Sequence, residues 1–171
     1  MHAYHDALFY FMSIALEHTT LTVPMFGVPI ENMTSSISIT GLAHVGIRVH
    51  NLERSTRFYE MLGFRKTLGP VGPEPVAILE HDSGLEINLI LNAPIATEPN
   101  VLMDIPVKHA GITHIALLCP NLMVAKAQLE AAEIPISGGP IRFSATSQGM
   151  FVRDPDGNVI ELHQRDENVV V

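Results

Sequence analysis

Two histidines stand at the start of two similar segments, and each could bring an imidazole to a common site. The first segment reads His44-Val-Gly-Ile-Arg-Val and the second reads His114-Ile-Ala-Leu-Leu-Cys. A carboxylate, Glu161, lies in a third apolar segment with the alternation of a strand. Two imidazoles and one carboxylate suit a first-row divalent metal ion and leave coordination sites open for water and substrate. These residue types therefore predict a metal site made of His44, His114 and Glu161.

The equivalence of the two histidines carries this prediction, because a lone histidine in a strand is more often a structural residue. The other histidines of the two halves have no counterpart of this kind. They are expected to be surface or loop residues, or to support the ligands: His50, His81, His109 and His163.

An internal duplication explains why the two histidines match. Four pairs of identical residues share one offset of 70 positions, which is the signature of a repeated unit: Gly41 and Gly111, His44 and His114, Asn51 and Asn121, Leu52 and Leu122. A further match comes later in each half, where a turn glycine precedes a strand. Gly84-Leu-Glu-Ile-Asn88 parallels Gly157-Asn-Val-Ile-Glu161.

Each half predicts one strand, one helix and three further strands. The expected elements are strands 42–50 and 112–119, helices 52–62 and 122–133, and short strands at 65–68, 76–80, 85–92, near 136, at 149–153 and at 159–163. Gly138-Gly139-Pro140 and Asp154-Pro-Asp-Gly157 read as breaks between strands. In the first strand of each half, one set of alternate residues is apolar and should pack on a helix. The opposite face carries the histidine.

Composition limits the class of protein. The chain has 171 residues, 47% of them apolar and 16% charged, so it is long and apolar enough for one folded domain. Its net charge is −8 and it contains no cluster of cations, which argues against a nucleic-acid partner. The apolar run from Ala7 to Leu16 is too short to span a bilayer. With a single cysteine, Cys119, and no charged leader, the chain is expected to be cytoplasmic.

Three segments lie outside the two halves. Residues 1–39 are interpreted as an extension, with a short helix at 4–17 and a linker; it is either a dimerisation arm or lid, or an upstream addition to a start at Met33. Residues 93–110 join the halves as a lid or a plain crossover. Residues 166–171 form a tail. The predicted domain is therefore 40–165, with modules 40–92 and 111–165.

The pattern resembles the vicinal oxygen chelate superfamily, which includes glyoxalase I, bleomycin-resistance proteins and extradiol dioxygenases. The resemblance covers about residues 40–165. It depends on His44-Val-Gly-Ile-Arg-Val, on the helix Leu52-Glu-Arg-Ser-Thr-Arg-Phe-Tyr-Glu-Met-Leu-Gly-Phe64, on Gly111-Ile-Thr-His-Ile-Ala, and on Phe151-Val-Arg-Asp-Pro-Asp-Gly-Asn-Val-Ile-Glu161-Leu. It implies an α+β fold of two βαβββ modules that form an eight-stranded, incompletely closed barrel around a metal, often in a homodimer. The modules of one cup can come from one chain or from two.

The resemblance implies four ligand places for a glyoxalase, one on each of four strands. His44, His114 and Glu161 match three places. The second place is open: Asn88 matches by its distance from the turn glycine, whereas Glu86 lies one pleat away on the same face. Arg48 and Asn92 fall where glyoxalase I holds the glutathione moiety, which makes them candidate substrate-binding residues.

Three activities follow from this resemblance. The leading hypothesis is a glyoxalase-like lyase or isomerase acting on a small α-carbonyl compound or its thiol adduct. Its divalent metal would be Ni, Zn, Co, Mn or Fe(II), and Glu161 or Glu86 would move the proton. The alternative is an iron(II) ring-cleaving dioxygenase with His44, His114 and Glu161 as ligands, although the second half lacks the tyrosine that those enzymes place near iron. A third hypothesis is a metal-free protein that sequesters a small molecule.

Overall fold

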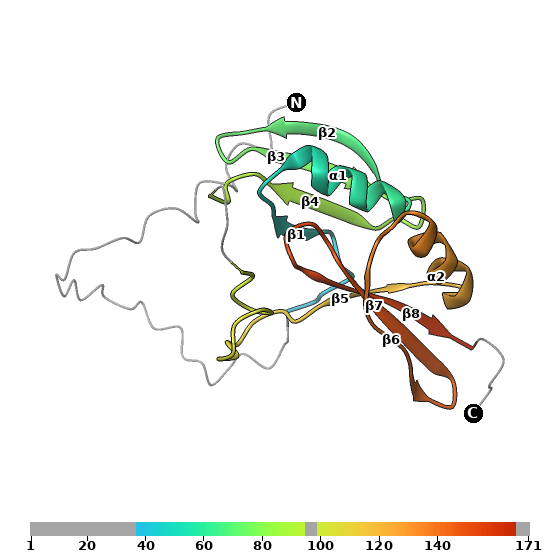
Figure 1. Ribbon diagram of the computed structural model, residues 1–171. Helices are drawn as coiled ribbons and strands as arrows, with labels where there is room; N and C mark the ends of the chain where they lie inside the picture. The colour runs from blue at the N-terminus through green and yellow to red at the C-terminus, as the bar shows by residue number, and fades with distance from the viewer. Residues whose placement is uncertain (1–36, 95–98, 167–171) are drawn as a thin grey trace, which may run out of the picture. The chain divides into compact units, whose positions relative to one another are not determined.

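The computed structural model describes residues 37–94 and 99–166, and residues 41–171 form one compact unit. The expected helix at 4–17 and most of the expected extension lie outside the described residues, as do positions 95–98 and 167–171. The elements follow in the order strand, helix and three strands, twice (Figure 1): β1 Val45–Arg48, α1 Leu52–Met61, β2 Arg65–Val71, β3 Val76–Glu80, β4 Glu86–Ile90, β5 Ile115–Leu118, α2 Leu122–Ala131, β6 Ile136–Ser144, β7 Ser147–Arg153 and β8 Val159–Arg165.

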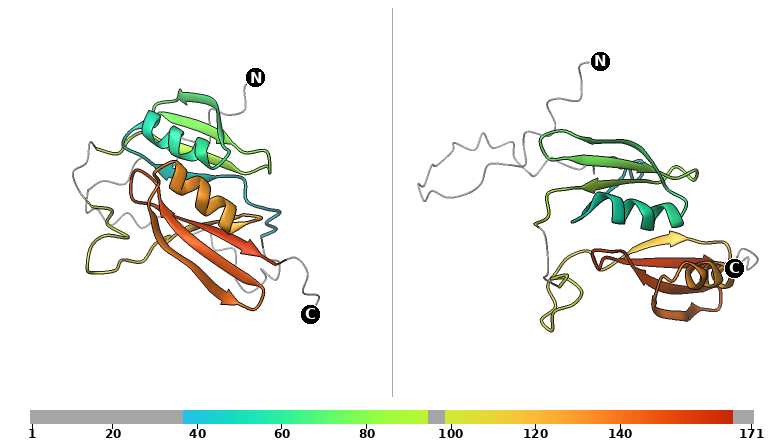
Figure 2. Two further views of the ribbon diagram at one scale, coloured as in Figure 1. Left: turned by 45° about the vertical axis from the view of Figure 1, so that its right-hand side comes forward. Right: turned by 45° about the horizontal axis from the view of Figure 1, so that its top comes forward.

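The eight strands form two four-stranded sheets of identical topology. Sheet A, from module 1, has the order β1-β4-β3-β2, and sheet B, from module 2, has the order β5-β8-β7-β6. In each sheet the first strand runs parallel to the last, and the other pairs are antiparallel. Each helix lies along its own sheet (Figures 1 and 2). The predicted fold of two βαβββ modules in an incompletely closed barrel is confirmed.

Asparagine caps place both helices at the predicted positions. The Asn51 side chain accepts a hydrogen bond from the Arg54 N–H at 2.9 Å, and Asn121 accepts from Met123 and Val124 at 3.0 Å. These bonds satisfy backbone donors that the first turn of a helix leaves free. After α1, Gly63 has a φ of +90°, a conformation that glycine adopts without the steric cost of a Cβ.

Several strands differ from the prediction in length, among them β1, β5 and β6. The first strand of each module pairs with its partner over four residues only, so His44 and His114 lie immediately before β1 and β5. In contrast, β6 continues through the predicted break at Gly139. The φ of Gly139 is +84°, and the pairing of β6 with β7 shifts register around it. The glycine therefore bends the strand with a bulge instead of ending it.

The core lies where the alternation of apolar residues placed it. Ile47 and Val49 are buried, whereas His44, Gly46 and Arg48 on the opposite face are exposed. Buried apolar side chains from both modules form one cluster. On α1 the buried residues are Ser55, Phe58 and Tyr59. No helix in the described part of the chain is long and apolar enough to cross a membrane.

The β7–β8 turn of module 2 binds to α1 of module 1 through a buried carboxylate. Tyr59 donates its hydroxyl to Asp154 Oδ2 at 2.9 Å, and Asn158 donates its side-chain amide to the same oxygen at 2.9 Å. Asp154 Oδ1 accepts the backbone N–H groups of Asp156 and Asn158. Burial raises the pKa of Asp154, and these hydrogen bonds oppose the rise. Burial and the nearby carboxylate raise the pKa of Tyr59 far above its usual range, so the hydroxyl remains a donor.

The described part of the connection between the modules packs against the same turn. Asn100 donates to the Asp156 carbonyl oxygen and to Asn158 Oδ1, both at 3.3 Å. Arg153 donates to Asp104 Oδ1 at 2.6 Å. These contacts hold the described part of the connection against the β7–β8 turn.

We expect Tyr59→Phe to lower the free energy of unfolding by about 1–3 kcal/mol, because it removes a donor from a buried carboxylate and leaves the ring in place. The matched control is Thr56→Val on the same helix, since the buried Thr56 hydroxyl has no partner among the described residues. Urea denaturation of both variants measures the difference. Equal midpoints for Tyr59→Phe and the wild type would contradict the expectation.

Candidate functional site

Glu161 lies between two histidines on sheet B. Its side chain is 7% exposed, and Oε2 is 3.1 Å from His114 Nε2. Oε1 is 2.6 Å from His163 Nδ1. The parallel pairing of β5 with β8 explains this proximity, because Ala116 lies opposite Glu161 and His114 precedes β5 on the same face. His114 and Glu161, two of the predicted ligands, are thus in direct contact.

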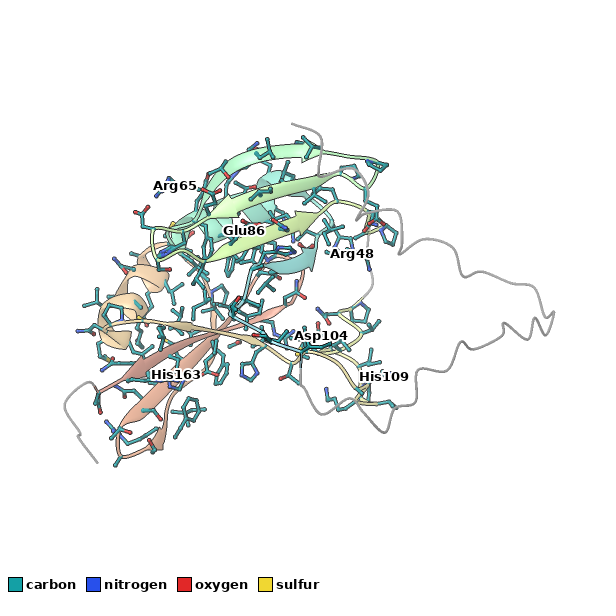
Figure 3. All side chains as sticks on the ribbon, turned by 180° about the vertical axis from the view of Figure 1, so that it is seen from behind. Arg48, Arg65, Glu86, Asp104, His109 and His163 are labelled. Carbon is teal, nitrogen blue, oxygen red and sulfur yellow. The ribbon has the colours of Figure 1, made fainter. Side chains whose placement is uncertain are left out.

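A second imidazole–carboxylate pair lies on sheet A. His44 Nδ1 is 3.9 Å from Glu86 Oε1, and Glu86 is 32% exposed. Figure 3 labels Glu86 on β4 and His163 on β8, one on each sheet. Asn88, the other candidate for the second ligand place, lies opposite Gly46. Its buried Oδ1 has no hydrogen-bond partner in the described part of the chain.

The two pairs remain separate within one chain. Among residues 37–94 and 99–166, no three His, Cys, Asp or Glu side chains gather as a group that could hold a metal ion. His114 and Glu161 adjoin each other and His44 adjoins Glu86, but the predicted set of His44, His114 and Glu161 does not form one cluster. Each sheet therefore presents one imidazole–carboxylate pair.

The two candidate substrate-binding residues of module 1 contact each other. Arg48 donates from Nε to Asn92 Oδ1 at 2.6 Å, and Asn92 donates from Nδ2 to Glu74 Oε1 at 2.6 Å. Arg48 ends β1 and Asn92 follows β4, the neighbouring parallel strand. All three side chains are solvent-accessible, so the guanidinium can meet an anionic group of a ligand.

A cavity of about 520 Å³ opens on sheet B beside Glu161. Apolar and ionisable side chains line it together: Ala116, Leu118, Phe143, Glu161, His163 and Arg165. Sequence reasoning named Glu161 as a ligand and His163 as a surface, loop or supporting residue. A signal was present for His163 and Arg165, because positions 161, 163 and 165 of one strand project to the same face. No local pattern identifies Phe143, which comes from β6.

Of the other four histidines discussed above, two contact side chains away from the imidazole–carboxylate pairs. His50 Nδ1 is 2.7 Å from Asp156 Oδ1, at the joint between the modules. His81 Nδ1 is 2.7 Å from the Ser83 hydroxyl in the β3–β4 turn. His109 is exposed in the connection between the modules. Of this group only His163 contacts a predicted ligand.

Known proteins share this sequence pattern and this fold. A family model described as the Glyoxalase/Bleomycin resistance protein/Dioxygenase superfamily matches residues 41–162. A catechol-2,3-dioxygenase of Bacillus subtilis (strain 168) is 31% identical over 138 residues, which are 77% of this chain and 44% of the relative. The chain thus spans less than half of that curated relative.

Two solved structures show the likeness of fold. A glyoxylase/bleomycin resistance protein/dioxygenase domain from Frankia sp. EAN1pec matches with a TM-score of 0.64 and 22% identity, over 77% of this chain and 96% of that one. A fosfomycin resistance protein from Listeria monocytogenes matches with a TM-score of 0.56 and 17% identity, over 74% of this chain and 91% of that one. From the family match over its two modules, the chain belongs to the glyoxalase/bleomycin resistance protein/dioxygenase superfamily.

Proposed function

We propose that this protein is a divalent-metal-dependent enzyme of the glyoxalase type, acting on a small α-carbonyl compound or its thiol adduct. One observation carries the proposal: each module presents an imidazole–carboxylate pair, His44 with Glu86 and His114 with Glu161. Together the pairs supply two nitrogen and two oxygen donors, a set suited to Ni, Zn, Co, Mn or Fe(II). The donor chemistry fits a metal, and the separation of the pairs requires that they be brought together.

A homodimer brings the pairs together. A twofold axis that sets sheet A of one protomer against sheet B of its partner creates two equal sites. Each site then has His44 and Glu86 from one protomer and His114 and Glu161 from the other. This assembly explains why the described residues of one chain hold two half-sites and no complete one.

The residues around the half-sites have separable roles in the proposed reaction. A bound metal would act as a Lewis acid on adjacent substrate oxygens. Arg48 and Asn92 bind an anionic group and orient the substrate. Glu86 is better suited to move the proton than Glu161, because it is more exposed and contacts one imidazole instead of two. The cavity beside Glu161 receives the apolar part of the substrate.

A ring-cleaving dioxygenase is the second candidate, and the 31% identity to a catechol-2,3-dioxygenase favours it. In that case His44, His114 and Glu161 would hold iron(II), and Asn88 would remain a neutral neighbour. The two functions share three ligands and differ in whether Glu86 also binds.

The bound metal and the substrate test the proposal directly. We expect purified protein to contain nickel, zinc or cobalt and to convert a hemithioacetal, measured by elemental analysis and an absorbance assay. Iron together with oxygen uptake on catechols would establish the dioxygenase instead. Protein that takes up no metal would contradict both enzymes and favour a protein that sequesters a small molecule.

Mixed dimers test the assembly of the site. We expect His44→Ala and His114→Ala each to lose bound metal when pure. When the two variants are unfolded together and refolded, about half of the dimers are mixed and each contains one intact site, so about a quarter of the wild-type metal returns. Each variant refolded alone is the control. No recovery in the mixture would show that both half-sites belong to one chain.

Two neighbouring substitutions test whether Glu86 or Asn88 occupies the second ligand place. We expect Glu86→Ala to weaken metal binding by more than the roughly 100-fold that outer contacts are worth, since Glu86 adjoins His44. Asn88→Ala serves as the matched variant and should retain the metal. Metal affinity is measured by competition with a chromophoric chelator. The opposite order would assign the place to Asn88, and two unaffected variants would leave three protein ligands.

A further inference from the structure

The two modules differ at one cross-strand pair next to the ligand strands. In sheet B, Gly149 of β7 lies opposite His163 of β8. The corresponding pair in sheet A is Val76 of β3 and Ile90 of β4. Each pair lies two residues beyond the repeat-equivalent positions Glu161 and Asn88. Module 2 has therefore gained an imidazole where module 1 has an alkyl group, and has lost a side chain on the facing strand.

The missing side chain at Gly149 makes room for Glu161. A Cβ at position 149 would lie 2.9 Å from Glu161 Oε1 and 2.7 Å from the nearest ring atom of Phe143. Real Cβ atoms do not approach heavy atoms this closely. The glycine thus leaves the space in which the carboxylate and the Phe143 ring lie.

His163 occupies a fixed position beside the carboxylate. Its Nδ1 is 2.6 Å from Glu161 Oε1, and its side chain is 20% exposed. The Phe143 ring stacks on the imidazole, with centroids 5.7 Å apart and planes at 20°. Because Oε1 is bound by His163, the other oxygen, Oε2, is directed at His114. The carboxylate is oriented before any ligand arrives.

We propose that His163 is a positioning residue that holds Glu161 in the orientation required for metal binding. Gly149 leaves the space for the carboxylate, and Phe143 stacks on the His163 ring. The proposal rests on the proposed metal-dependent function and adds an asymmetry to it. The sheet B half-site is preorganised, whereas Glu86 of sheet A has no such partner among the described residues and contacts only His44, at 3.9 Å. Groups that orient a ligand in this way strengthen metal binding without touching the metal.

Two substitutions of His163 separate orientation from packing. His163→Phe keeps an aromatic ring to stack on Phe143 and removes the donor, and it should weaken zinc affinity about 10–100-fold. His163→Asn places an amide nitrogen at the same distance along the side chain as Nδ1, and it should restore affinity to within a few-fold of wild type. His109→Gln, which removes an exposed histidine, is the control and should change nothing. Unaltered zinc affinity in His163→Phe would overturn the proposal.

The absorption spectrum of the cobalt-substituted protein tests whether His163 is itself a ligand. A positioning residue leaves the ligand-field bands of wild type and His163→Asn the same, because the atoms bound to cobalt are unchanged. Different bands would show that the His163 nitrogen binds the metal, and that result would overturn a positioning role.

A variant of Gly149, on the facing strand β7, tests whether Glu161 needs the space beside it. Gly149→Ala should weaken zinc affinity to a similar extent, because the added Cβ displaces Glu161 Oε1. Val76→Ala, at the equivalent position of sheet A, is the matched control and should bind zinc as the wild type does. Circular dichroism establishes that each variant is folded. Wild-type zinc affinity in Gly149→Ala would contradict the claim that Gly149 leaves necessary space for the Glu161 carboxylate.

Wild-type protein that binds no metal would refute the proposed function. The positioning of Glu161 by His163 can still be tested in metal-free protein. In metal-free protein, ¹⁵N NMR should find the proton of neutral His163 on Nδ1, with a strongly downfield resonance that disappears in Glu161→Ala. A proton on Nε2 only, in the wild type, would overturn the positioning role independently of any metal.

Discussion

The buried carboxylate of Asp154 is the contact on which the placement of the site depends. A buried charge is expensive unless it is hydrogen-bonded, and here both oxygens accept two bonds each, one of them from the Tyr59 hydroxyl of the other module. The turn that carries Asp154 leads directly into β8, where Glu161 and His163 lie. Fixing the turn against α1 therefore fixes the start of the strand that carries the half-site of module 2.

Local signals in the sequence predicted the modules well, whereas contacts between strands had to come from the structure. The asparagine caps, the alternation around Ile47 and the repeat of 70 residues report on neighbours along the chain, so element order and buried faces followed from them. The glycine–proline pair at Gly139 predicts a break because such pairs punctuate turns, but in a twisted sheet the same glycine forms a bulge. The Tyr59–Asp154 hydrogen bond and the positions of Gly149 and Phe143 beside Glu161 join residues more than ten positions apart, which no local pattern contains.

The candidate ligands illustrate the same limit. Repeat equivalence identified His44 and His114, and strand alternation placed Glu161 on the polar face. Neither signal states which sheets face each other, because that depends on how whole modules assemble. Within one chain the structure shows two separate imidazole–carboxylate pairs. A duplicated chain with one pair in each half is suited to twofold symmetry, because sheet A of each copy can face sheet B of the other.

The two carboxylates reach their histidines from different strand positions, and this difference gives them different properties. Gly46 lies opposite Asn88 and Ala116 lies opposite Glu161, so Asn88 is the true repeat equivalent of Glu161. Glu86 is displaced by one pleat toward the start of β4. Glu161 is consequently enclosed and held by two imidazoles, whereas Glu86 remains open to water and bound loosely. A proton carrier must exchange its proton and move between partners, and an enclosed carboxylate with both oxygens engaged is poorly able to do so. The proposed site therefore combines one enclosed acid, Glu161, with one exposed acid, Glu86.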